Sequence, residues 1–118
     1  MANKLQTGRA GELIAKRYLE DKGYEIIEQN YRTKYAEIDL VAIKNKKLVF
    51  VEVRTKVGEN FGAPEETINK KKMRKLWKNA AAYADVKKWN GPCGIDAVCI
   101  VLKPDYSIER LSHYENIA

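Results

Sequence analysis

The chain has 118 residues, of which 45% are hydrophobic and 32% charged, a balance typical of one folded domain and not of a disordered segment. Its 22 basic and 16 acidic residues leave a net charge of +6, which favours anionic partners such as nucleic acids. No stretch approaches the roughly 18 apolar residues of a membrane helix, and the first residues lack a signal-peptide pattern. We therefore expect a cytoplasmic protein that forms a single domain over residues 1–118.

The first half of the chain predicts one helix and three strands. Apolar residues at helical spacing over residues 9–22 indicate a helix, and Gly23 is a natural stop for it. The segment YEIIEQ (24–29) is typical of a strand, as are EIDLVAI (37–43) and LVFVEVRTK (48–56). A loop marked by Gly and Pro, VGENFGAP, follows the third strand.

The second half predicts a helix and two strands. Asn69 is a candidate N-cap, and a stripe of apolar residues at spacings of three and four follows it: Met73, Leu76, Trp77, Ala80, Ala81 and Ala84. The run IDAVCIVL (95–102) indicates a strand covered on both faces, and SIERL (107–111) a short last strand. The order α-β-β-β-α-β-β predicts an α/β fold with a mixed central sheet flanked by helices.

The second and third strands each carry a carboxylate, and a hairpin would bring the two together. If Lys44 pairs with Lys47 across the short turn KNKK, the same register places Asp39 directly opposite Glu52. Opposed like charges cost about 0.2–1 kcal/mol. A hard divalent cation such as Mg²⁺, or Mn²⁺ in its place, would turn this repulsion into binding.

A plainer interpretation is that both acids face solvent and pair with lysines. The predicted acidic face also carries Val41 and Phe50, which argues against a simple surface. The pattern alone leaves a metal site and a charged surface both open.

The spacing of these acids resembles the D…ExK motif of the PD-(D/E)XK nucleases, which have the restriction-endonuclease-like fold. Five blocks in order, GRAGELIAKRYLEDKGY, EIDLVA, LVFVEVRTK, FGAPEETINKKK and IDAV, are similar to the YraN family of small bacterial proteins. That family is related to archaeal Holliday junction resolvases, and the similarity covers roughly residues 8–101.

The resemblance implies a metal-dependent site for phosphodiester hydrolysis, with branched or structured DNA as a candidate substrate. Asp39 and Glu52 match the two metal-binding acids, and the carbonyl of Val53 would complete their ligand set. Glu12 matches an acid on the first helix of the resolvase relatives, where we expect it near the helix start. The expected cofactor is Mg²⁺ or Mn²⁺, and the expected partner is DNA; a homodimer stays open.

Arg54 stands where the nuclease motif usually has lysine. Arginine is always charged and cannot activate water by losing a proton, although it can orient a phosphate. The lysine role would then pass to Lys56, on the same strand face, or to Lys72, which matches a lysine of the family. This departure keeps a second hypothesis open, a nucleic-acid-binding module without turnover, and an adaptor that binds a protein is a third.

Two further segments are candidates for binding nucleic acid. The run KKKMRKLWK (70–78) holds six basic residues and no acid, and it supplies charge for phosphates. Its candidate contact residues are Lys70, Lys71, Lys72, Arg74 and Lys75. The segment 31–35, which contains Tyr31 and Tyr35, could stack on an unpaired base, and the lone His113 is assigned no role.

Overall fold

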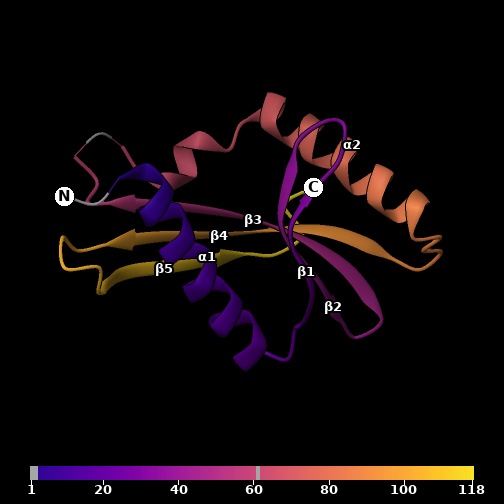
Figure 1. Cartoon of the computed structure of the whole chain (residues 1–118), viewed down its shortest axis with the longest axis horizontal. Helices are drawn as coiled ribbons and strands as arrows, with labels where there is room; N and C mark the ends of the chain where they lie inside the picture. The colour runs from indigo at the N-terminus through magenta and orange to yellow at the C-terminus, as the bar shows by residue number, and fades with distance from the viewer. Residues whose placement is uncertain (1–2, 61) are drawn as a thin grey trace.

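A computed structural model describes residues 3–60 and 62–118 and contains two α-helices, a 3₁₀-helix and five strands (Figure 1). In chain order these are α1 (Lys4–Asp21), β1 (Glu25–Arg32), β2 (Glu37–Lys44), β3 (Lys47–Val57), η1 (Pro64–Thr67), α2 (Lys70–Val86), β4 (Cys93–Leu102) and β5 (Ile108–Tyr114). No helix in the described ranges is long and apolar enough to cross a membrane.

The five strands form one sheet in the order β1-β2-β3-β4-β5. All neighbours are antiparallel except β3 and β4, which run parallel because the chain crosses between them through α2. The predicted mixed sheet and the order α-β-β-β-α-β-β are confirmed. This arrangement is compatible with the restriction-endonuclease-like fold.

The predicted hairpin between β2 and β3 has the expected register. Lys44 pairs with Lys47, and the ladder continues to the pair of Leu40 and Val51. The two turn residues, Asn45 and Lys46, have φ values of 49° and 65°, as two-residue hairpin turns require. A local turn therefore fixes which side chains of the two strands meet.

Helix α1 begins earlier than the predicted start at residue 9. The side chain of Asn3 accepts a hydrogen bond from Gln6 N, and Gln6 Oε1 accepts one from Asn3 N. This reciprocal capping box satisfies backbone donors at the first turn, so the helix starts at Lys4. Glu12 consequently lies in the middle of the helix, and the expectation of a position near its start was wrong.

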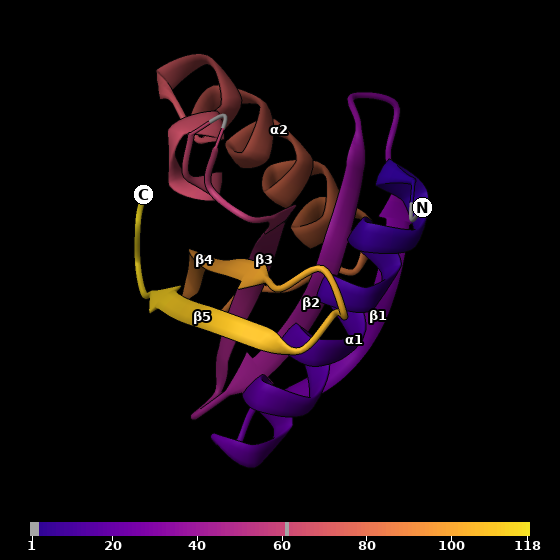
Figure 2. The same cartoon turned by 90° about the vertical axis from the view of Figure 1, so that its left-hand side faces the viewer.

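Apolar side chains pack on both faces of the sheet, and Figures 1 and 2 show α1 and α2 on different sides of it. The α1 cluster contains Ala15, Leu19, Val49, Val51 and Val98, whereas the α2 cluster contains Phe50, Leu76, Ala80, Tyr83 and Ile95. Alternate residues of β3 enter the two clusters, as the pleat of a strand requires. The central strands are therefore buried on both faces.

The apolar stripe of α2 differs from the predicted one. The buried residues are Leu76, Asn79, Ala80 and Tyr83, while Trp77 keeps 39% of its surface exposed. Successive helical residues turn by about 100°, so Trp77 lies to one side of the line through Leu76 and Ala80. Assigning Trp77 to the core was wrong.

We expect Gly11→Ala to destabilise the protein and Gly8→Ala to stabilise it. A Cβ at Gly11 would overlap Thr55 Oγ1 and lie 2.7 Å from Thr55 Cβ, and overpacking of this kind costs about 1–3 kcal/mol. A Cβ at Gly8 would meet nothing within 4 Å, which leaves a gain of about 1 kcal/mol in helix propensity. Urea unfolding measures both variants, and equal free energies of unfolding would contradict the close approach of α1 to β3.

Candidate active site

The site is built where β2 separates from β3. The ladder ends at the pair of Leu40 and Val51, one pair before the predicted pairing of Asp39 with Glu52. The next backbone hydrogen-bonded pair in this register would join Ile38 to Val53. Instead, Asp39 Oδ2 accepts a hydrogen bond of 2.8 Å from Val53 N. The side-chain carboxylate of Asp39 thus accepts the hydrogen bond that the N–H of Val53 would otherwise donate to the backbone of β2.

Glu52 of β3 is the neighbour of Asp39 of β2. Its side chain is buried, with only 3% of the residue's surface exposed. Its Oε2 is 2.7 Å from Arg54 Nη2 and 3.2 Å from Lys72 Nζ. Burial of a carboxylate requires such partners. The interpretation of Glu52 as a solvent-facing acid is therefore wrong, although it does pair with a lysine.

The acids of the site repel one another. Burial raises the pKa of Asp39 well above its ordinary value, and the negative charges of Glu52 and Glu12 raise it further. Burial also raises the pKa of Glu12, as do the charges of Glu37 and Glu52. Repulsion among these carboxylates favours a bound proton or a bound cation at the site.

Glu12 reaches the site from α1, where its Oε1 accepts a hydrogen bond of 3.0 Å from Asn30 Nδ2. It lines a cavity of about 330 Å³ together with Val53, Arg54 and Lys56. Asp39 and Glu52 do not line this cavity themselves, but Val53 donates to Asp39 and Arg54 pairs with Glu52. Residues from α1 and β3, far apart in sequence, therefore meet at one place.

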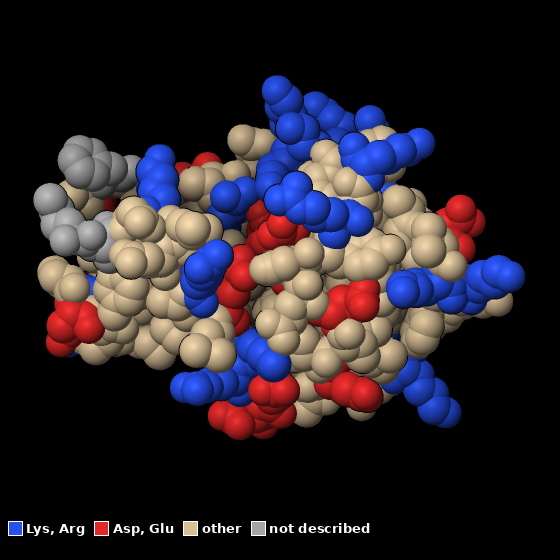
Figure 3. All heavy atoms as spheres, in the orientation of Figure 1, with Lys and Arg blue, Asp and Glu red and all other residues tan. Residues whose placement is uncertain are grey.

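Lys72 comes from the first turn of α2, whose N-cap is Asn69 as predicted. Asn69 Oδ1 accepts a hydrogen bond of 2.9 Å from Lys72 N, which fixes the helix start beside β3. The other basic residues of this predicted set are exposed: Lys70, Lys71, Arg74 and Lys75. Figure 3 shows basic side chains gathered over α2, with acidic atoms beneath them.

Comparison with known proteins identifies the family to which this chain belongs. A family model described as the uncharacterised protein family UPF0102 matches residues 11–100. The chain belongs to this family. Relatives are UPF0102 proteins of Caldanaerobacter subterraneus subsp. tengcongensis, 37% identical over 97% of this chain and 95% of the relative, and of Syntrophomonas wolfei, 45% identical over 94% and 96%. Another, from Sulfurihydrogenibium sp., is 44% identical over 75% and 77%.

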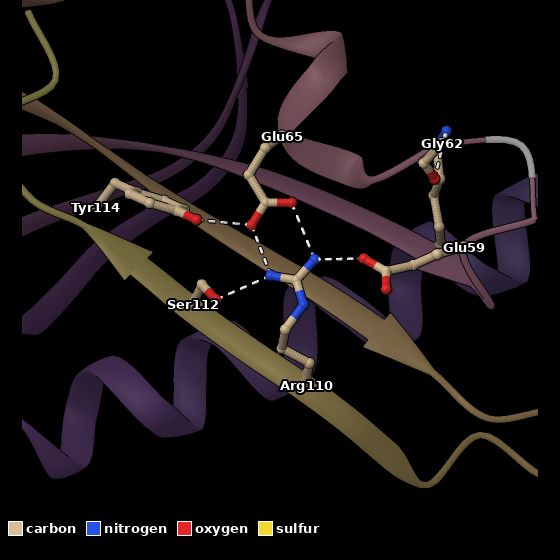
Figure 4. Close-up of polar contacts among 7 residues, drawn as sticks. Glu59, Gly62, Glu65, Arg110, Ser112 and Tyr114 are labelled. Carbon is tan, nitrogen blue, oxygen red and sulfur yellow. Dashed lines mark hydrogen bonds and ion pairs between the residues drawn. The ribbon is translucent and has the colours of Figure 1, made fainter.

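Sequence reasoning missed a polar cluster in this UPF0102 chain that joins η1 to β5 (Figure 4). Arg110 of β5 donates to Glu65 of η1 at 2.6 and 3.0 Å and to Glu59 at 2.7 Å. Tyr114 OH donates to Glu65 Oε2 at 2.8 Å. Pro64 of the same 3₁₀-helix lines the cavity, so the cluster, by joining η1 to the sheet, also positions this residue.

Sequence reasoning also missed the surroundings of His113, to which it assigned no role. His113 lies in β5, and its Nε2 is 2.8 Å from Asp96 Oδ2. In the described part of the chain, His113, Asp96 and Glu115 form the single group of at least three potential ligand residues whose ligand atoms all lie within 4.8 Å. The partners of Asp96 are distant in sequence, so no local pattern could show this group.

We expect the Glu65–Arg110 contact to make stability depend on acid pH. Hydrogen bonds from Arg110 lower the pKa of Glu65 from its ordinary 4.5 to about 2. The stabilisation is therefore present above pH 4.5 and lost as the pH falls towards 2. Glu65→Gln should lower the free energy of unfolding at pH 7 by about 1.5–3 kcal/mol and weaken its dependence on pH in that window.

Denaturant unfolding between pH 2 and pH 7 tests this expectation. Glu109→Gln, at an exposed position of β5, is the matched control because it leaves Glu65 and Arg110 in contact. A Glu65→Gln variant with the full wild-type pH dependence would show that the contact does not contribute.

Proposed function

We propose that this protein is a metal-dependent endonuclease that hydrolyses phosphodiester bonds in DNA. The observation that carries the proposal is the buried Glu52 carboxylate, placed beside Asp39 and within 3.2 Å of both Arg54 and Lys72. Acids beside fixed cations suit a site that must hold both a metal ion and a phosphate. The names of the relatives give the family and no activity, so the proposal rests on this geometry and on the PD-(D/E)XK resemblance.

The residues present fit a divalent cation. Asp39 and Glu52 offer hard carboxylate oxygens, the ligands that Mg²⁺ and Mn²⁺ take, and their repulsion is what a cation would relieve. The carbonyl of Val53 is the third ligand that we propose. When bound, the cation would polarise a phosphate and lower the pKa of a coordinated water.

The basic side chains have distinct roles in the proposed site. Arg54 binds and orients the phosphate, because its side chain lines the cavity and arginine stays charged. Lys72 is favoured for the role of the motif lysine, since its Nζ contacts Glu52 directly. Lys56 contacts the carbonyl of Gly62 at 3.4 Å and lines the same cavity, and Glu12 orients the attacking water.

One observation supports the second hypothesis, a nucleic-acid-binding module without turnover. Arg54 and Lys72 both contact the same oxygen of Glu52, so two cations already offset its charge. A protein that used these cations only to bind DNA would need no metal ion. Cleavage of linear, flapped and four-way DNA with Mg²⁺ or Mn²⁺ separates the two hypotheses.

We expect Mn²⁺ or Mg²⁺ at millimolar concentration to raise the Tm of the wild type and not that of Asp39→Asn. The metal binds the native acids and not the unfolded chain. Asparagine keeps an oxygen that can accept from Val53 N but loses the charge that attracts the cation. The same variant should lose DNA cleavage altogether while it stays folded.

Scanning calorimetry with metal and with chelator tests both proteins. The control is Glu28→Gln on β1, which removes one carboxylate outside the proposed ligand set. If metal raised the Tm of Asp39→Asn as much as that of the wild type, the assignment of the metal site would be refuted, whatever the cleavage result.

We expect DNA binding to be driven by the exposed basic face of α2. Replacing Lys71 and Lys75 with Gln should flatten the slope of log K against log salt by up to about 0.9 for each lost contact with a duplex phosphate. Lys72 is left intact because it contacts Glu52. The charge-matched control replaces Arg17 of α1 and the exposed Lys103, and an equal slope change in both double variants would place the contacts elsewhere.

A further inference from the structure

We infer that a groove between the β1–β2 loop and the second half of α2 binds an unpaired nucleic-acid strand. This inference rests on the proposed interaction with nucleic acid and names the substrate class, one with a single-stranded segment beside the site. The groove has a volume of about 800 Å³ and is lined from the loop side by Tyr31, Arg32, Lys34 and Tyr35. Figure 1 shows this loop rising beside α2.

The aromatic residues of the groove offer surfaces for stacking. Tyr35 keeps 47% of its surface exposed, and the Nζ of Lys34 lies 5.3 Å from its ring centroid. The ring of Tyr31 is held edge-on against Tyr83, with centroids 4.9 Å apart. The ammonium of Lys34 lies over one face of this exposed ring of Tyr35. An aromatic ring combined with a nearby cation can bind an unpaired base through stacking and its phosphate through charge.

The loop that carries Tyr35 is fixed in place. Thr33 N donates to Ala36 O at 2.9 Å, Tyr35 N donates to Thr33 Oγ1 at 3.1 Å, and Thr33 Oγ1 is also hydrogen-bonded to Asn79 Oδ1. Asn79 is only 1% exposed, so a buried polar residue of α2 anchors the loop. A binding surface that is already ordered loses little conformational entropy when a ligand arrives.

The charge and shape of the groove fit a strand of nucleotides. Its basic residues are Arg32, Lys34 and Lys78, against one acid, Asp85. Ala81 and Ala82 line the α2 side, and their small side chains leave the groove open. A duplex has its bases stacked already, whereas an unpaired strand can turn a base onto Tyr35.

The groove and the proposed active site both involve residues of α2. Lys72 contacts Glu52 at the start of α2, and Lys78, six residues later, lines the groove. Six helical residues span about 9 Å. A strand bound in the groove would therefore lead towards the acid pair.

The test measures binding in chelator, without metal or cleavage, by fluorescence anisotropy of the full chain. The probes are an oligo-dT strand, an oligo-rU strand and a blunt DNA duplex at equal salt. We expect the wild type to prefer a single strand to the duplex. Tyr35→Ala should weaken single-strand binding by about 5- to 150-fold, the range for one stacked base, and leave duplex binding unchanged.

Tyr35→Phe is the matched control, because it keeps the ring and should keep the single-strand affinity. Since Tyr35 is exposed, Tyr35→Ala should melt at the wild-type temperature, which excludes unfolding as the cause of any loss. Equal single-strand binding by wild type and Tyr35→Ala, or a wild type that prefers the duplex or binds no probe, overturns the inference. Cleavage without Tyr35-dependent binding would refute this inference and leave the nuclease proposal standing. Tyr35-dependent binding without cleavage would support this inference and refute the nuclease proposal.

Discussion

The separation of β2 from β3 at Asp39 is the constraint on which the site depends. The carboxylate of Asp39 accepts the N–H of Val53, so β2 can leave the ladder without a buried donor losing its partner. Ile38 then packs in the α2 cluster, while Leu40 packs in the α1 cluster. The regular alternation of faces therefore breaks at the residue that carries the acid.

That change of direction also positions the loop that follows β1. Tyr31 pairs with Ile38, so β1 turns with β2 and brings the loop between them to α2. There Thr33 is hydrogen-bonded to the buried Asn79, and the proposed groove forms beside this contact. One irregularity in the sheet thus lies next to both the acid pair and the aromatic loop.

Sequence patterns predicted the features that short-range interactions determine. The two-residue turn at Asn45 and Lys46 sets the hairpin register, and the Asn69 cap sets the start of α2. The same patterns could not show that Arg110 contacts Glu65, 45 residues away, or that Glu12 meets the strand acids across the α1 interface. These contacts depend on packing between elements, which alternation and spacing do not encode. The start of α1 is different, because Asn3 and Gln6 were a local signal that sequence reasoning overlooked.

The cluster around Asp96 and the acids around Asp39 differ in how well their charges are satisfied. Asp96 receives hydrogen bonds on both oxygens, from Asn116 N at 3.0 Å on Oδ1 and from Tyr24 OH at 2.9 Å on Oδ2, where His113 also lies at 2.8 Å. A buried carboxylate with this many partners stabilises the fold and has little left to offer a ligand.

Asp39 is in the opposite situation, because its burial and then the neighbouring charges of Glu52 and Glu12 oppose its ionisation and raise its pKa. Folded proteins avoid such conflicts except where a ligand resolves them. The cluster around Asp96 is the tighter group of potential ligands, yet its hydrogen bonds are already made. The repulsion at Asp39 therefore supports the proposed cation site better than the cluster around Asp96 would.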